Sequence, residues 1–231
     1  MQLKLLNRQI EAYREYLRGP QAEERLYVWE SQRIFQEHWD LEAADLARMY
    51  DASLENSRTR RLWRREHYEP KAMMLHFLKQ SPEFVRSMFR DLFNQEKSID
   101  GRAQRFVFYC DELLQEYKKA HPRSIENNHY HDDDYHMVFL YLAFRYPARY
   151  ALYDFDAFVG TLRSLGVTQL PRANDLPRFV KVTATLDKLL RKDEVLLDRH
   201  RQRLGRDERS YQGESRLLVY DFYQFCTAPS R

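Results

Sequence analysis

Apolar side chains recur at spacings of three and four along most of this sequence, and few residues interrupt the pattern. The first such series is Leu3, Leu6, Ile10, Tyr13 and Leu17. This spacing places side chains on one face of a helix. Only six glycines and eight prolines stand among the 231 residues, so helices are seldom broken. The sequence therefore predicts a mainly α fold of about nine or ten helices, with at most a short strand near 150–153.

The length of the chain is enough for one domain with a sizeable core. We expect a single helical domain over 1–231. Within it, 1–20 would be an amino-terminal helix, 21–166 the main helical body, and 167–231 a long helix followed by a closing helix. Phe179 to about Leu204 is predicted to be that one long, charge-rich helix.

Helix ends are signalled by small polar residues and glycine. Ser81 before Pro82 and Ser98 are predicted N-caps, because a serine oxygen can accept a free amide of the first turn. Asp154 or Asp156 should cap the next short helix, and Gly166 should end it.

Composition limits the classes of function. The formal net charge is only +3, so nucleic-acid binding would need a local basic patch. No apolar run approaches the roughly 18 residues of a membrane span, and the charged amino-terminal segment does not resemble a signal peptide. Cys110 and Cys226 lie far apart, so free thiols in a cytoplasmic protein are expected.

The stretch HYHDDDYH, residues 129–136, is the densest polar run in the chain. Asp132 and His136 are four apart and could share a helix face as metal ligands. Three carboxylates directly before a helical apolar pattern are, however, what a helix N-terminus favours. Capping is the preferred interpretation, and neither a metal nor another cofactor is expected.

Sequence motifs of the common enzyme classes are absent. There is no P-loop, no dinucleotide-binding glycine pattern and no nucleophile elbow. Asp111 with Glu116-Tyr117-Lys118 imitates a nuclease pattern, but it lies in a helical rather than a strand context, which makes chance the better explanation. The chain is predicted not to be an enzyme.

The strongest basic patch is RTRRLWRRE, residues 58–66. Arginines grip phosphates in bidentate geometry, and an aromatic side chain among them can stack on a base. The alternative is a solvated loop whose tryptophan turns into the core, which is the preferred place for that ring. The candidate nucleic-acid-binding residues are Arg58, Arg60, Arg61, Trp63, Arg64 and Arg65.

A second basic run alternates with acids and is more typical of a solvated helix face. Its members are Arg199, Arg201, Arg203, Arg206 and Arg209.

Four segments together resemble the amino-terminal region of McrB-like AAA-family proteins, the GTP-driven motor subunits of modification-dependent restriction systems. They are YVWESQRIFQEHWDLEAADLARMYDASL, LWRREHYEPKAMMLHFLKQSPEFVRSMFRDLF, HYHDDDYHMVFLYLAFRYPARYALYDFDAF and LLVYDFYQFC. The resemblance covers roughly residues 26–226 and rests on aromatic and apolar positions with RYP and Y-DF landmarks.

The resemblance implies a target-recognition domain in a phage-defence system, often one that recognises modified DNA. A following AAA module would hydrolyse GTP and a nuclease partner subunit would cut. This chain contains no Walker motif, so no catalytic residue is carried over, and the arginine patch is assigned from the residues alone.

The leading hypothesis is therefore a non-catalytic, cytoplasmic DNA-binding domain with no membrane partner. If all five arginines contacted phosphates, log K would fall with log salt at a slope of about −4.5. The rival is a helical protein-interaction module that ties a motor to a partner subunit. The amphipathic first helix and the predicted Phe179–Leu204 helix favour that rival.

Overall fold

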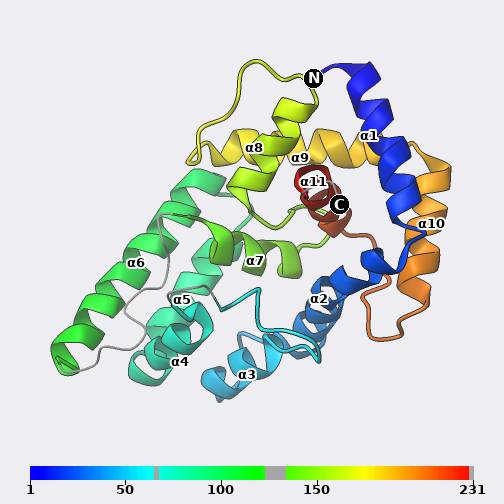
Figure 1. Cartoon of the computed structure of the whole chain (residues 1–231). Coiled ribbons are helices and arrows are strands. Elements are labelled where there is room, and N and C mark those ends of the chain that lie inside the picture. The colour runs from blue at the N-terminus through cyan, green and yellow to red at the C-terminus, as the bar shows by residue number, and fades with distance from the viewer. Residues whose placement is uncertain (65–67, 123–133, 229–231) are drawn as a thin grey trace. The chain divides into compact units, whose positions relative to one another are not determined.

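The structure is a computed structural model that describes residues 1–64, 68–122 and 134–228 (Figure 1). These residues form α-helices and one short 3₁₀ helix, η1, and contain no strand, 150–153 included. The mainly α prediction is confirmed, with one or two helices more than expected. The elements are α1 (Leu3–Tyr16), η1 (Pro20–Arg25), α2 (Tyr27–His38), α3 (Leu46–Ser53), α4 (Pro70–Gln80), α5 (Pro82–Phe93), α6 (Ile99–Ala120), α7 (His136–Arg145), α8 (Phe155–Ser164), α9 (Leu176–Leu190), α10 (Glu194–Gly205) and α11 (Leu217–Thr227).

The predicted long helix over 179–204 is wrong, because it is two helices, α9 and α10. The break falls at Arg191–Asp193, where the Asp193 carboxylate accepts the backbone N–H of Leu196 at 2.9 Å and so caps α10. The same carboxylate forms an ion pair with Arg14 of α1. An N-cap inside a continuous periodic pattern thus starts a second helix.

Most predicted helix ends are confirmed. Ser98 caps α6 through the amide of Gly101, and Asp154 caps α8 through the amide of Ala157. Gly166 follows α8 with a φ of +70°, the left-handed conformation that favours glycine. Ser81 occupies the N-cap position of α5 and Pro82 the first turn, as predicted, but the Ser81 side chain makes no capping hydrogen bond.

Contacts group the chain into two compact units, residues 1–30 with 146–231 (unit 1) and residues 31–145 (unit 2). The boundary falls inside α2, after Glu30. Unit 1 is built from two separated stretches of sequence, whereas unit 2 is continuous. The single domain over 1–231 stays a prediction.

Unit 2 is organised around α7, in which every residue from His136 to Phe144 is buried. Its aromatic side chains meet those of α2, α3 and α5. Tyr141 shares a 2.7 Å hydrogen bond with Tyr50, and the ring of Phe89 packs edge-on against Tyr141 at 5.0 Å. Such pairs add directional preference to apolar burial.

Unit 1 is organised around α11, which contacts α8, α9 and α1 (Figure 1). Thr161 of α8 donates to the carbonyl of Tyr223, and the Tyr223 hydroxyl donates to the carbonyl of Leu152. Both predicted free cysteines are free, Cys110 buried and Cys226 partly buried. Among the described residues, no helix is long and apolar enough to cross a membrane.

Candidate nucleic-acid interface

The predicted basic patch lies on the segment between α3 and α4, and residues 56–64 of it are called the arginine loop here. Asn56 fixes its first turn. The side-chain Oδ1 of Asn56 accepts the backbone N–H groups of Arg58 at 2.8 Å and Thr59 at 2.6 Å, while its side-chain Nδ2 donates to the Thr59 carbonyl at 2.5 Å. An asparagine that bonds its own backbone in this way closes a tight turn. The Arg64 amide then bonds the Arg60 carbonyl at 2.8 Å, which makes a second turn.

The four described arginines of this loop, Arg58, Arg60, Arg61 and Arg64, are all exposed. Arg64 forms an ion pair with Glu69 at 3.0 Å. The side chains of Arg60 and Arg61 make no hydrogen bond or ion pair to any described residue. Two guanidiniums therefore face solvent with their charge uncompensated.

Acids near the loop already have partners. The Lys71 ammonium of α4 lies 2.7 Å from the Asp51 carboxylate and 2.8 Å from the Glu55 carboxylate. Glu69 is paired with Arg64. Two cations thus face three carboxylates, and each of these acids is held by a residue other than Arg60 and Arg61.

Trp63 points into the core of unit 2 rather than to solvent. Its side chain is only 4% exposed, and the Lys71 ammonium lies 5.6 Å from the centre of its ring. The preferred interpretation of a core tryptophan is confirmed. In this conformation the ring offers no free face to a nucleobase, so Trp63 anchors the loop that carries the arginines.

His136 also contacts the backbone of the loop. It is buried, and its Nε2 lies 2.7 Å from the carbonyl oxygen of Leu62, so that nitrogen must carry a proton and donate it. The backbone amide of His136 bonds the Asp134 carboxylate at 3.0 Å, which agrees with the capping interpretation. A nitrogen that donates to a carbonyl is not available to bind a metal.

The remaining candidates cannot be placed. Arg65 and Asp132 lie outside the described residues. In the described part of the chain, no three histidine, cysteine or acidic side chains gather in a way that could hold a metal ion.

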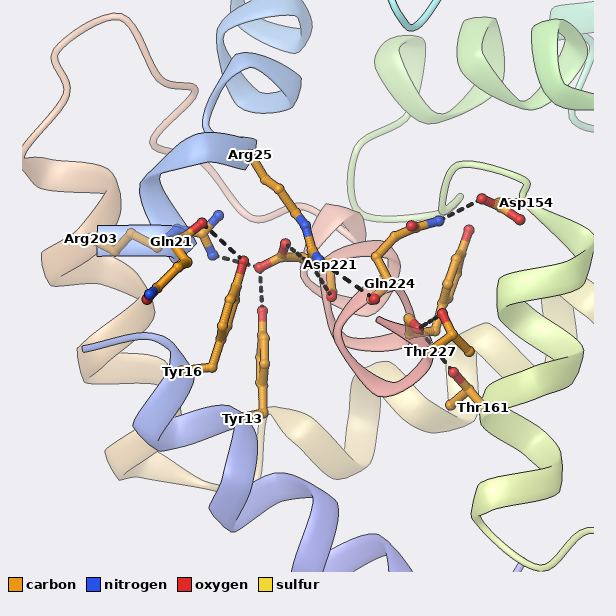
Figure 2. A network of polar contacts seen from close by, with 11 residues as sticks. Tyr13, Tyr16, Gln21, Arg25, Asp154, Thr161, Arg203, Asp221, Gln224 and Thr227 are labelled. Carbon is orange, nitrogen blue, oxygen red and sulfur yellow. Dashed lines mark hydrogen bonds and ion pairs between the residues drawn. The ribbon is translucent and has the colours of Figure 1, made fainter. Parts of the chain in front are cut away.

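The second basic run is not a uniformly solvated face, and here the expectation needs correction. Arg201 and Arg206 are exposed, but Arg203 is only 1% exposed. Figure 2 shows it pointing toward Asp221 of α11, with its Nη1 at 2.5 Å from the carboxylate. Arg203 thus belongs to the interior of unit 1.

Asp221 is the centre of a group of four side chains, called the Asp221 cluster, with Tyr13 and Arg203, which are buried, and Arg25, which is partly exposed (Figure 2). The Tyr13 hydroxyl donates to it at 2.6 Å and Arg25 lies at 3.2 Å. Burial by itself raises the pKa of Asp221, but the guanidiniums of Arg203 and Arg25 outweigh burial and hold the pKa below its usual range. The carboxylate is ionised and fully buried.

The Asp221 cluster is structural rather than catalytic. Asp221 and Tyr13 have no exposed surface, so no substrate reaches them. The guanidinium of Arg203 also lies 4.9 Å from the ring centre of Trp29, and Trp29 in turn contacts His200. Burial lowers the pKa of His200 to about 3, so this imidazole is neutral. The sequence signal for the cluster was one aspartate inside an otherwise apolar helix, LLVYDFYQF.

Comparison of the chain with family models, with curated proteins and with solved structures finds no match.

Proposed function

We propose that the chain binds DNA through the arginine loop and is not itself an enzyme. One observation carries this proposal: Arg60 and Arg61 are exposed and unpaired in the described part of the chain, on a loop whose backbone is already fixed. A preordered loop loses little entropy on binding, and guanidiniums match phosphate geometry. Arg58 and Arg64 flank them as further contacts.

The resemblance to McrB-like proteins supplies the biological setting of this proposal. In that setting the chain is the target-recognition domain of a cytoplasmic restriction system for phage defence. A separate GTP-hydrolysing AAA module and a nuclease subunit would supply the motor and the cutting activity. The arginine loop would grip phosphates, and preference for a modified base would come from contacts elsewhere, because Trp63 is buried.

The test is fluorescence anisotropy of labelled duplexes, carrying cytosine, methylcytosine or hydroxymethylcytosine, at several salt concentrations. If only Arg60 and Arg61 contact phosphates, the slope of log K against log salt should be about −1.8. With all five arginines in contact it should be about −4.5. Tighter binding of a modified duplex would support the restriction setting.

The decisive variant is the double substitution R60E/R61E, which should abolish salt-dependent binding. Its matched control is R201E/R206E, which reverses two exposed arginines of unit 1 that have ion-pair partners. Equal loss in both variants would mean that only net charge matters. Absence of binding by the unmodified protein at low salt would reject the proposal and favour the protein-interaction module.

A further inference from the structure

The solvent face of α9 in unit 1 carries cations and no exposed acid. Arg178, Lys181 and Lys188 lie along one side of the helix, at spacings of three and seven. The only acid in α9 is Asp187, which is 5% exposed and paired with Arg191.

These cations lack the partners that other basic residues in the protein have. Lys181 and Lys188 are exposed, and their ammonium groups make no ion pair or hydrogen bond to a described residue. The guanidinium of Arg178 donates to the backbone carbonyl of Gln169 and forms no ion pair with a described residue. By contrast, surface arginines such as Arg33 and Arg90 each have a carboxylate within 3 Å. The face of α9 is therefore open to an external anion.

An apolar groove runs beside these cations. Its volume is about 210 Å³, and its lining residues are Met1, Leu162, Val167, Arg178, Val182, Thr185 and Leu186. A pocket for a cofactor usually encloses roughly 300–1,000 Å³. This groove is smaller than that and suits individual apolar side chains of a larger partner.

One wall of the groove is held by a defined turn. The Val167 amide bonds the Leu162 carbonyl and the Gly166 amide bonds the Arg163 carbonyl, both at 2.9 Å, with Gly166 in the left-handed conformation. This pair of bonds is the Schellman motif, which brings the side chains of Leu162 and Val167 together. The wall thus exists before any partner arrives.

We propose that this face of α9 docks an acidic amphipathic helix of a partner protein. Its apolar residues, spaced three and four apart, would enter the groove over Val182 and Leu186. Its carboxylates would meet Arg178, Lys181 and Lys188. A nucleic acid would satisfy the cations but has no apolar side chains to fill the groove, so the combination favours a peptide.

The experiment uses the whole chain and fluorescein-labelled synthetic peptides of about 20 residues. One peptide has leucines at helical spacing and glutamates on its other face. A second has lysine in place of each glutamate, and a third is a scramble of the first. Only the first is expected to bind, and its affinity should fall as salt rises because the contact includes exposed charges.

Two variants test the two halves of the face. K181E/K188E should weaken binding of the glutamate peptide at least tenfold, and V182E should do the same by placing an acid in the groove. Val182 is only partly buried, so both variants should keep the helical circular dichroism of the native protein. R60E/R61E, in unit 2, is the control and should leave peptide binding unchanged.

Three results would overturn this inference. They are failure of the glutamate peptide to bind, equal binding of the scrambled peptide, and unchanged affinity in K181E/K188E. Loss of duplex DNA affinity in K181E/K188E, without any peptide binding, would instead assign the face to nucleic acid. Since the arginine loop and α9 are altered separately, failure of either proposal leaves the other testable.

Discussion

The arginine loop and the Asp221 cluster use the same side chain in opposite environments. Arg60 and Arg61 face water on a loop without a partner among the described residues. Arg203 is buried and bonded to Asp221. Both lie in sequence runs rich in arginine, so local composition does not separate them. What separates them is an acid placed on a distant apolar helix, which decides whether an arginine can leave water.

This difference predicts which substitutions affect stability and which affect binding. Changes in the Asp221 cluster should destabilise the fold, because a buried charge left alone is costly. Changes in the arginine loop should alter DNA affinity and leave the fold nearly unchanged.

The largest effect is expected from Asp221→Ala. It leaves the guanidinium of Arg203 buried without its carboxylate, which should cost about 3–5 kcal/mol of unfolding free energy. Urea denaturation measures this cost. Asp221→Asn keeps the shape and a hydrogen-bonding oxygen for Tyr13 but removes the charge. Asp221→Asn should therefore lower the unfolding free energy nearly as much as Asp221→Ala does. Near-native stability of Asp221→Asn would show that the charge is unimportant.

The second effect is a pH dependence that comes from His200. Its pKa is about 3 in the folded protein, because of burial, and about 6.5 when unfolded. The unfolded state therefore binds an additional proton as the pH falls below about 6.5. The unfolding free energy should drop by up to about 1.4 kcal/mol per pH unit from this residue, until the pH reaches about 3.

Denaturation curves between those two pH values test the contribution of His200. His200→Gln should remove this part of the slope, whereas His38→Gln, at an exposed histidine of α2, should not. Parallel slopes in the native protein and in His200→Gln would mean that the imidazole is accessible to solvent.

Asp221 affects stability at lower pH than His200 does. The pKa of the Asp221 carboxyl is lower in the folded protein than in the unfolded chain. Asp221 therefore contributes its full stability at pH values above the unfolded pKa, and this stability is lost as the pH falls through the folded pKa.

The smallest effect is expected from Asn56→Ala in the arginine loop. This change removes the side-chain bonds that close the turn before Arg60. Binding would then have to order the loop, at a cost of roughly 1 kcal/mol, so DNA affinity should fall about fivefold. The salt slope should stay the same because every arginine is retained. A changed slope would show that Asn56 alters the number of phosphate contacts rather than the order of the loop.

Much of the fold could be predicted because it depends on local chemistry. The spacing of apolar residues gives the helices, and Ser98, Asp154 and Gly166 mark ends where the sequence predicts them. The break between α9 and α10 was missed because its capping residue, Asp193, stands within an uninterrupted apolar pattern. A cap is recognised more easily when a breaker stands beside it.

The candidate site was less predictable because burial depends on tertiary contacts. Sequence alone located the arginines and favoured a core position for Trp63. It gave no sign that the imidazole of His136 would bond the carbonyl of Leu62, 74 residues earlier. It also placed Arg203 on the surface, since nothing near Arg203 points to Asp221, 18 residues later on another helix.

The discontinuity of unit 1 sets an order on its assembly during synthesis. Unit 2 is complete once residue 145 has left the ribosome, whereas α1 must wait for α10 and α11. At roughly 5–20 residues per second, the interval between synthesis of α1, which ends at Tyr16, and of α11, which ends at Thr227, lasts about 10–40 s. For this interval the apolar stripe of Leu6, Ile10 and Tyr13 has no native surface to cover it. The apolar stripe of α1 therefore stays uncovered by its native partners until α10 and α11 have been synthesised.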